Sequence, residues 1–305
     1  MADSKFDVIV IGAGITGLTA AKHAAQSGLT VASVEALLFG GLVININELD
    51  PGLPGEQVSG TDLASNLMAE ISELGVESLS ETVTALTRNG DQLTVTSDAG
   101  THLARAVIVA SGAKLKRLGI PGEAEFEYKG VSQCADCDGP MYKDEDVVVV
   151  GGGDSALQEA LVLAHFCKSV HLVHRGAKYR ARQDLIDAVA ARDNIRPLWN
   201  SVAEEIVGAE MVNMVRVRNV GAERRSEIPC AGFFAYIGLE PNCAFVPPAV
   251  KRDEHRALVT DATLQTSIPG LFAAGAVRAG YGGLLTHAVA EGKAAAAAVT
   301  ASVEK

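Results

Sequence analysis

A glycine turn near the start of the chain most constrains what it can fold into. The turn reads Gly-Ala-Gly-Ile-Thr-Gly at residues 12–17, between the β-branched apolar run Phe6–Ile11 and a helical pattern. In this order Gly12 forms the tight turn, Gly14 lets backbone N–H groups approach a pyrophosphate, and Gly17 lets helix and strand pack closely. The alternative is a glycine-rich loop without function. We expect a dinucleotide to bind at Gly12, Gly14, Ile15, Thr16 and Gly17.

The next predicted strand ends in an acidic residue. This strand, Thr30–Val34, follows the helix, and Glu35 stands at its tip. A carboxylate at this place accepts hydrogen bonds from ribose hydroxyls. The first unit is therefore expected to hold a nucleotide with a free ribose.

The middle of the chain repeats this pattern with a basic tip. The apolar run Val147–Val150 opens onto Gly-Gly-Gly-Asp-Ser-Ala, a helical pattern follows, and the strand Val170–Val173 then leads into His174 and Arg175. Arginines at this place suit a 2′-phosphate, which favours NADP(H). The alternative is a basic surface loop. The expected contacts are Gly151, Gly153, Asp154, Ser155, Ala156, His174, Arg175 and Arg180.

A Cys-x-x-Cys pair lies just before this second turn. Cys134 and Cys137 can close a small disulfide ring, and Asp138 follows them directly. Such pairs tend to contain one thiol of lowered pKa, and a dithiol beside a dinucleotide indicates redox chemistry. The alternative is half of a zinc site, which needs a second Cys or His pair. Because the other cysteines are single and scattered, we expect no metal and interpret them as small buried hydrophobes: Cys167, Cys230 and Cys243.

Two βαβ modules in 305 residues predict an α/β fold with two Rossmann-like domains. Further predicted elements are a helix over Thr61–Leu74, a hairpin around Asn89-Gly90-Asp91, a strand over Leu271–Gly275 and a closing helix over Leu284–Val303. The glycine- and proline-rich stretch 39–55 is expected to form a loop over a ligand.

Composition narrows the function classes. The formal net charge is −11, which disfavours nucleic acid and anionic membrane surfaces as partners. The apolar runs are far too short to span a bilayer, and the start of the chain lacks a signal-peptide pattern. Five cysteines, an odd number, disfavour a secreted disulfide framework. We therefore expect a cytoplasmic protein with no membrane segment.

The order of these motifs resembles the bacterial low-molecular-weight thioredoxin reductases. The resemblance extends to Gly40-Gly41, Ala110-Ser111-Gly112 and the Ser-Ile-Pro-Gly-Leu-Phe-Ala-Ala-Gly run at 267–275. It implies a discontinuous FAD-binding domain, residues 1–115 and 242–305, with an NADP(H)-binding domain inserted as residues 116–241. It also implies a homodimer. Electrons would pass from NADPH to FAD, to the disulfide, and on to thioredoxin or a thioredoxin-like protein.

The resemblance also assigns roles to residues. It places Cys137 toward the flavin, makes Cys134 the thiol that attacks the partner disulfide, and makes Asp138 the acid–base group. Thiol–disulfide exchange needs these parts, because a thiolate attacks and a proton must reach the leaving sulfur. Further FAD contacts are implied at Gly41, Leu42, Ala110, Ser111, Gly112, Gly275 and Ala276.

Three positions depart from the family pattern. Gly176 stands where a second arginine usually follows the histidine, which predicts a weaker 2′-phosphate clamp. Ala276 replaces an aspartate, and Gly283-Leu284 replaces an Arg-Gln pair near the flavin. These changes predict weaker FAD binding. They also leave other functions open. The chain could use the same electron relay with another donor or acceptor, act as a dithiol oxidase on a small molecule, or be a redox- or nucleotide-sensing protein without turnover.

Overall fold

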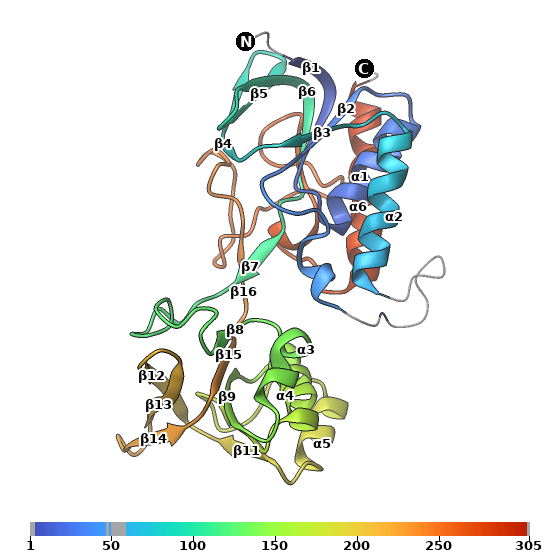
Figure 1. Cartoon of the computed structure of the whole chain (residues 1–305). Coiled ribbons are helices and arrows are strands. Elements are labelled where there is room, and N and C mark those ends of the chain that lie inside the picture. Colours follow the sequence, from blue (N-terminus) through green and yellow to red (C-terminus); the bar gives the residue numbers. More distant parts are fainter. Residues whose placement is uncertain (1–3, 47–48, 50–58, 304–305) are drawn as a thin grey trace. The chain divides into compact units, whose positions relative to one another are not determined.

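The structure of the chain, a computed structural model, describes residues 4–46, 49 and 59–303 (Figure 1). It divides into two compact units, Met1–Lys114 with Glu240–Lys305, and Leu115–Leu239. Each unit has its own parallel sheet flanked by helices. This confirms the predicted α/β fold with two Rossmann-like units, the second inserted into the first.

The first unit is built on a parallel sheet in the order β3-β2-β1-β6, with β17 beside β6. Its strands are β1 (Ser4–Ile11), β2 (Val31–Glu35), β3 (Glu77–Ser80), β6 (Thr101–Val109) and β17 (Leu271–Ala273). Two antiparallel strands, β4 (Val83–Asn89) and β5 (Gln92–Ser97), extend the sheet beyond β6. They form the predicted hairpin. The carboxyl ends of the parallel strands meet at one edge, where sheets of this type bind ligands.

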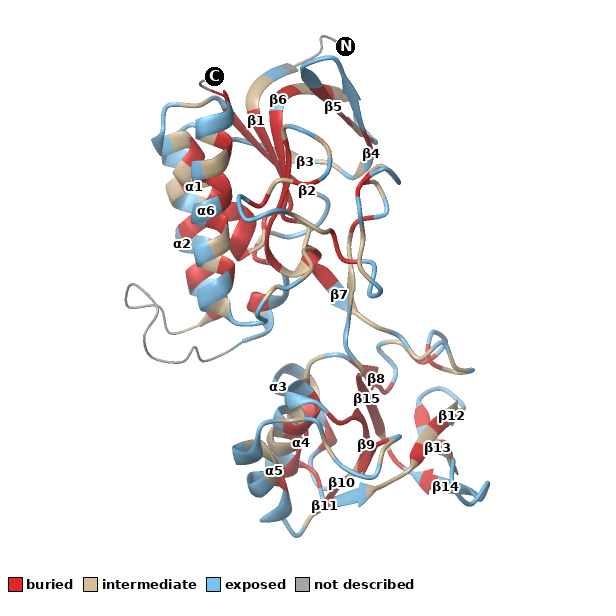
Figure 2. Ribbon diagram, turned by 180° about the vertical axis from the view of Figure 1, so that it is seen from behind, coloured by how far each residue is buried: buried red, intermediate tan, exposed pale blue. Residues whose placement is uncertain are grey.

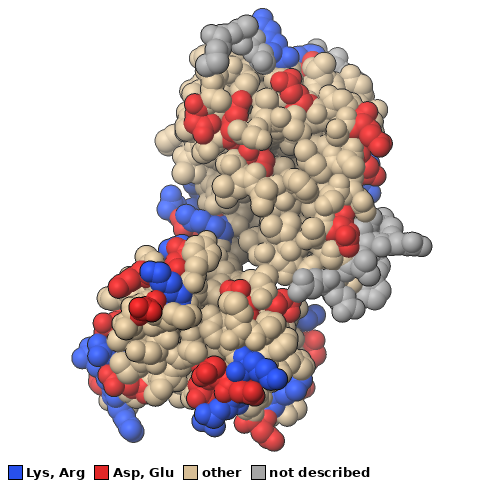
Figure 3. All heavy atoms as spheres, in the orientation of Figure 1, with Lys and Arg blue, Asp and Glu red and all other residues tan. Residues whose placement is uncertain are grey.

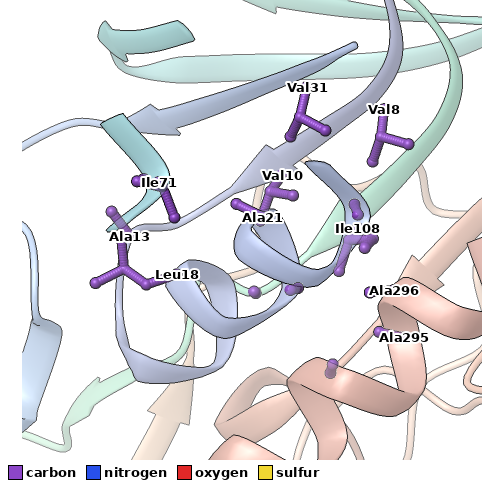
Figure 4. Packing of buried hydrophobic residues seen from close by; sticks show 14 of the residues in the cluster. Val8, Val10, Ala13, Leu18, Ala21, Val31, Ile71, Ile108, Ala295 and Ala296 are labelled. Carbon is purple, nitrogen blue, oxygen red and sulfur yellow. The ribbon is translucent and has the colours of Figure 1, made fainter. Parts of the chain in front are cut away.

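Three helices pack beside this sheet. They are α1 (Ile15–Gln26), α2 (Gly60–Glu73) and α6 (Leu285–Val303), with short 3₁₀ turns η1 (Gly41–Asn45) and η3 (Gly275–Val277). Two of the helices, α1 and α6, have mostly small side chains. Figure 4 shows Ala21 of α1 close to Val10 of β1, in a cluster of buried residues that also contains Leu18 of α1 and Ala295 of α6. A Cβ atom added to Gly292 would lie 2.5 Å from the Thr16 carbonyl oxygen, so α6 approaches α1 as closely as glycine permits.

The second unit repeats the arrangement. Its parallel sheet has the order β11-β10-β9-β15-β8, and its inner strands β10, β9 and β15 are mostly buried (Figure 2). The strands are β8 (Val131–Ser132), β9 (Asp146–Gly151), β10 (Ser169–Val173), β11 (Ile195–Leu198) and β15 (Gly232–Tyr236). The helices are α3 (Ala135–Asp138), α4 (Asp154–Phe166) and α5 (Gln183–Ala190), with the 3₁₀ turn η2 (Gly139–Tyr142).

An antiparallel meander, which the sequence patterns did not predict, completes this unit. It consists of β12 (Ser201–Gly208), β13 (Val212–Asn219) and β14 (Arg225–Pro229). Its surface carries ion pairs, including Arg216 with Glu205 and Arg218 with Glu223. On the face drawn in Figure 3, basic and acidic side chains are interspersed over the second unit.

The chain passes between the units twice, and the two passages pair with each other. They contain the short strands β7 (Ala113–Leu115) and β16 (Leu239–Pro241), and Lys116 N donates to the Gly238 carbonyl at 2.9 Å. Across the described ranges, every helix is too short or too polar to traverse a bilayer.

Candidate active site

The cysteine pair lies at the start of α3 in the second unit. Cys134 and Cys137 form a disulfide with an S–S distance of 2.12 Å, and their Cα atoms are 5.3 Å apart. Cys134 caps the helix, and its sulfur accepts a hydrogen bond from the Cys137 backbone N–H at 3.1 Å. An N–H directed at sulfur stabilises a thiolate more than a thiol, which favours Cys134 as the attacking group after reduction.

Ser132 connects the carboxylate to the cysteine loop. Its hydroxyl donates to Asp138 Oδ2 at 2.5 Å and accepts from the Cys134 backbone N–H at 3.1 Å. The bridge holds the carboxyl group of Asp138 beside the dithiol. Ser132 was not predicted from the sequence, although its position on β8 just before the first cysteine was an available signal.

A second carboxyl group approaches the dithiol from α4. Glu159 Oε2 accepts from the Ala135 backbone N–H at 3.2 Å and from the Tyr236 hydroxyl at 3.3 Å. Burial raises the pKa of Glu159, and the nearby charge of Asp136 raises it further. Burial and Glu159 likewise raise the pKa of Tyr236. Glu159 and Tyr236 were not predicted from the sequence, because no local motif marks them.

The other thiols are chemically quiet. Cys167, Cys230 and Cys243 are free and buried, as predicted. Burial raises the pKa of Cys167 to about 11 and that of Cys230 to about 12, so both stay protonated near neutral pH. Within the described ranges, no group of three or more His, Cys, Asp or Glu side chains is placed to hold a metal ion.

The second glycine turn presents the first turn of α4 to open space. A Cβ atom added to Gly153, the N-cap residue, would meet no heavy atom within 4 Å. Asp154 turns toward the neighbouring loop, where its Oδ1 accepts from the Arg182 backbone N–H at 2.8 Å. Ser155 is exposed and Ala156 is buried. An open helix start of this kind fits a phosphate-bearing ligand.

His174 and the arginines beside it have different surroundings. The His174 ring is buried, with Nδ1 3.0 Å from the Gly151 carbonyl oxygen and Nε2 2.9 Å from that of Lys178. The ring thus supports the glycine turn from behind. Arg175 and Arg180 are exposed, and neither forms an ion pair with any residue that the structure describes. Their guanidinium groups are available to an anionic ligand.

The first glycine turn is tightly closed. Gly12 has a φ of 103°, and an added Cβ would lie 2.5 Å from the Ala110 carbonyl oxygen. A Cβ added to Gly17 would lie 1.8 Å from the Gly12 carbonyl oxygen. Glu35 Oε2 accepts from the Ala13 backbone N–H at 2.8 Å, so the acidic strand tip reaches the turn. These contacts leave only glycine at the two positions and fit the backbone demands of a bound dinucleotide.

Two loops border this turn. Gly40 N donates to the Ala13 carbonyl at 2.7 Å, which brings Gly41 and the exposed Leu42 next to it. In the strand-end loop, the Ser111 hydroxyl donates to the Asn242 carbonyl at 2.6 Å, and Gly112 has a φ of 65°. Residues 47–48 and 50–55 of the predicted ligand loop lie outside the described residues.

The turn after β17 contacts the first glycine turn. An added Cβ at Gly275 would lie 2.6 Å from Thr16 Oγ1, so only glycine fits there. Beside Ala276, the carboxylate of Glu291 accepts from the Gly275 backbone N–H at 2.7 Å and pairs with Arg278. This ion pair was not predicted from the sequence.

The predicted residues therefore gather in two places. The set around the first turn comprises Gly12, Gly14, Ile15, Thr16, Gly17, Glu35, Gly41, Leu42, Ala110, Ser111, Gly112, Gly275 and Ala276. The set in the second unit comprises Gly151, Gly153, Asp154, Ser155, Ala156, His174, Arg175 and Arg180. Cys134, Cys137 and Asp138 lie in the same second unit.

Known proteins share this architecture and these motifs. Residues 6–292 match the family described as pyridine nucleotide-disulphide oxidoreductase. A thioredoxin reductase of Treponema pallidum is 34% identical over 304 residues, 99% of this chain and 98% of that protein. A bifunctional thioredoxin reductase/thioredoxin of Mycobacterium leprae is 37% identical over 273 residues, 88% of this chain and 59% of that protein.

A solved structure agrees with these relatives. Lactococcus lactis thioredoxin reductase, in its FR conformation, superimposes with a TM-score of 0.91 at 34% identity, covering 98% of this chain and 99% of that one. The chain therefore belongs to the pyridine nucleotide-disulphide oxidoreductase family, among the thioredoxin reductases, which are enzymes that use FAD and NADPH.

Proposed function

We propose that this chain carries electrons from NADPH through FAD to the Cys134–Cys137 disulfide, and from there to thioredoxin or a thioredoxin-like protein. One observation carries the proposal: the disulfide occupies the same unit as a nucleotide turn with free arginines, while the other unit has a separate dinucleotide turn. The relative that joins thioredoxin reductase and thioredoxin in one chain supports this acceptor.

We assign the first unit to FAD and the inserted unit to NADPH, as domains 1–115 with 242–305, and 116–241. The closed turn at Gly12–Gly17, with Glu35 beside it, would hold the pyrophosphate and ribose of FAD. The open start of α4, with Arg175 and Arg180, would hold the phosphates of NADPH. When bound, FAD supplies the step that converts a hydride into a pair of electrons for a disulfide.

The dithiol then performs two exchanges. The Cys134 thiolate attacks the partner disulfide, forms a mixed disulfide and releases one partner sulfur. The Cys137 sulfur attacks Cys134, re-forms the internal disulfide and releases the second partner sulfur. Two electrons and two protons reach the partner in this sequence. Asp138, held by Ser132, gives a proton to a leaving sulfur and accepts one from the incoming thiol.

The inserted unit has to serve the flavin in two ways. Its nucleotide site delivers reducing equivalents, and its disulfide collects them, yet both belong to one unit. We infer that the unit presents these two sites to the flavin in turn, by rotation about the paired passages β7 and β16. A crosslink that stops this rotation should block turnover and leave FAD binding intact.

We also propose a homodimer in the cytoplasm. The resemblance to thioredoxin reductases supports the dimer, and light scattering on the purified protein tests it. Three free thiols together with a single disulfide of active-site spacing support a reducing compartment.

Serine variants test the proposed function. Cys134→Ser should abolish thioredoxin reduction while NADPH still bleaches the flavin absorbance, because only the later exchange uses that thiol. Cys243→Ser is the matched control, since this thiol is free, buried and part of the other unit. Full disulfide reductase activity in both Cys134→Ser and Cys137→Ser would contradict the proposal. A panel of thioredoxins and the aromatic disulfide DTNB identifies the acceptor.

A further inference from the structure

We infer that Arg278 and Glu291 position the Gly275–Ala276 turn for flavin binding, and so make an acidic residue at position 276 unnecessary. The inference rests on the proposed FAD site of the first unit. It concerns positioning residues, and it replaces the expectation that Ala276 leaves this turn without support. Both side chains are about four-fifths buried, with exposed fractions of 18% for Arg278 and 15% for Glu291.

The turn belongs to the dinucleotide edge of the sheet. It follows β17, whose carboxyl end lies in the same parallel sheet as β1. Gly275 packs directly on Thr16, the fifth residue of the Gly12–Gly17 turn. Any displacement of this turn therefore reaches the place where the pyrophosphate binds.

Glu291 is held in place by the packing of its helix. Its neighbour Gly292 approaches the Thr16 carbonyl so closely that an added Cβ would lie 2.5 Å away. Glu291 therefore projects from a fixed point of α6 toward the turn, where its Oε2 accepts from Gly275 N at 2.7 Å. The same helix contact thus sets the distance between the carboxylate and the turn.

Arg278 completes the arrangement. Its Nε donates to Glu291 Oε2 at 3.1 Å, its Nη2 donates to Oε1, and its Nη1 donates to the Ala279 carbonyl at 2.8 Å. A mostly buried ion pair is retained at low cost only when its hydrogen bonds are satisfied, and these contacts satisfy most of them. The guanidinium keeps two further N–H groups, which form no hydrogen bond with the residues that the structure describes. They can serve a polar ligand at the turn.

This arrangement changes what Ala276→Asp should do. An aspartate at 276 would add a second carboxylate beside Glu291, and like charges at short range repel. We therefore expect Ala276→Asp to leave FAD affinity unchanged or to lower it. In a Glu291→Gln background the repulsion is gone, and the same substitution should restore binding.

A double-variant cycle with FAD binding as the readout tests the inference. FAD dissociation is measured by flavin fluorescence recovery on dilution, without any assay of turnover. Glu291→Gln should raise the FAD dissociation constant about 10- to 100-fold, because it removes charge-assisted hydrogen bonds at the turn. Adding Ala276→Asp should recover at least about half of that change on a logarithmic scale. Arg278→Lys, which keeps the charge and loses the paired geometry, should weaken FAD binding less than Glu291→Gln.

Glu70→Gln is the matched control. Glu70 forms an ion pair with Lys22 at 2.8 Å in the same unit, on a more exposed surface, and its variant should bind FAD as the wild type does. Thermal unfolding of the FAD-free proteins checks that each variant folds, and Arg278→Lys carries the test if Glu291→Gln does not. Wild-type FAD affinity in Glu291→Gln would overturn the inference. Where that variant does not fold, wild-type affinity in Arg278→Lys would do so. Equal tightening of FAD binding by Ala276→Asp in the wild-type and Glu291→Gln backgrounds would also overturn it. A wild-type chain that binds no FAD would instead overturn the proposed function.

Discussion

The two glycine turns of this chain share a pattern and differ in how closely the following helix approaches the turn. In the first, helix α1 lies so near the turn that only glycine fits at position 17, where an added Cβ would meet the Gly12 carbonyl at 1.8 Å. In the second, the equivalent residue is Ala156, and Gly153 faces open space. Both turns are tight at their first glycine, where a Cβ added to Gly12 or to Gly151 would lie 2.5 Å from a backbone carbonyl oxygen, so the two modules differ mainly in how closely the helix approaches the turn.

The strand tips after the two turns differ in charge and in direction. Glu35 turns back to its own turn and accepts hydrogen bonds from Ala13 N and Leu37 N. Arg175 and Arg180 are exposed and lack ion-pair partners among the residues that the structure describes. We propose that the residues following the second strand of each module give it a preference for a free ribose or for a 2′-phosphate.

The largest effect on this comparison is expected from exchanging the residue types of the two equivalent helix positions, Gly17 and Ala156. Gly17→Ala forces a methyl group against backbone, which should destabilise the first unit by roughly 1–3 kcal/mol or more and abolish FAD binding. Ala156→Gly adds helix flexibility without a clash and should cost about 1 kcal/mol, with NADPH still bound. Flavin absorbance after gel filtration measures the first effect, and thermal unfolding measures both. A Gly17→Ala protein that retains FAD would show that the first turn is not closed.

The next largest effect is expected from removing Arg175, which tests the difference in charge between the two strand tips. Arg175→Ala should lower kcat/KM for NADPH by about 10- to 100-fold and change the value for NADH little, because only the 2′-phosphate contact is lost. Arg216→Ala is the control, since Arg216 pairs with Glu205 and Glu227 on the meander of the same unit. Equal losses with the two coenzymes would remove the basis for a 2′-phosphate clamp.

The smallest effect concerns two glutamates whose pKa values shift in opposite directions. A hydrogen bond from Ser97 and one from His102 lower the pKa of Glu81 in the first unit, whereas burial raises that of Glu159 in the second. The stabilisation from Glu81 is present above the ordinary glutamate pKa of 4.5 and is lost as the pH falls through its lower folded value. The stabilisation from protonated Glu159 is complete below 4.5 and is lost as the pH rises through its raised value.

Glutamine variants of both residues test these signs. Glu81→Gln should destabilise the first unit by about 1 kcal/mol at neutral pH and progressively less in acid. Glu159→Gln should be as stable as the wild type in acid. As the pH rises it should become more stable than the wild type, because only the wild type loses the stabilisation from a protonated Glu159. The chain has one tryptophan, Trp199, which lies in the second unit, so its fluorescence follows that unit, while FAD release follows the first. The same pH trend for both variants would contradict the assignment.

Sequence patterns predicted the parts of this molecule that are local. The strand-turn-helix order around Gly12 and around Gly151 marks each nucleotide turn within about 25 residues, and the cysteine spacing marks the disulfide. These features depend on neighbouring residues alone. The structure confirms the elements and the disulfide.

The missed residues are those that tertiary structure brings together. Glu159 reaches the Ala135 backbone N–H between the two cysteines only because α4 packs beside α3, and Arg278 meets Glu291 across the start of α6. Neither has a spacing that a motif would record. His174 shows a related difficulty, because its place in the sequence indicates a ligand contact while its buried ring nitrogens face the backbone carbonyls of Gly151 and Lys178.

The most direct test of the proposed electron path is to count thiols after reduction by NADPH. Protein with and without FAD is treated anaerobically with NADPH, alkylated, and mapped by mass spectrometry. The account predicts alkylation at Cys134 and Cys137 only when FAD and NADPH are both present, because electrons reach the disulfide through the flavin. Alkylation of this pair by NADPH without FAD, or an intact disulfide in the complete mixture, would contradict it.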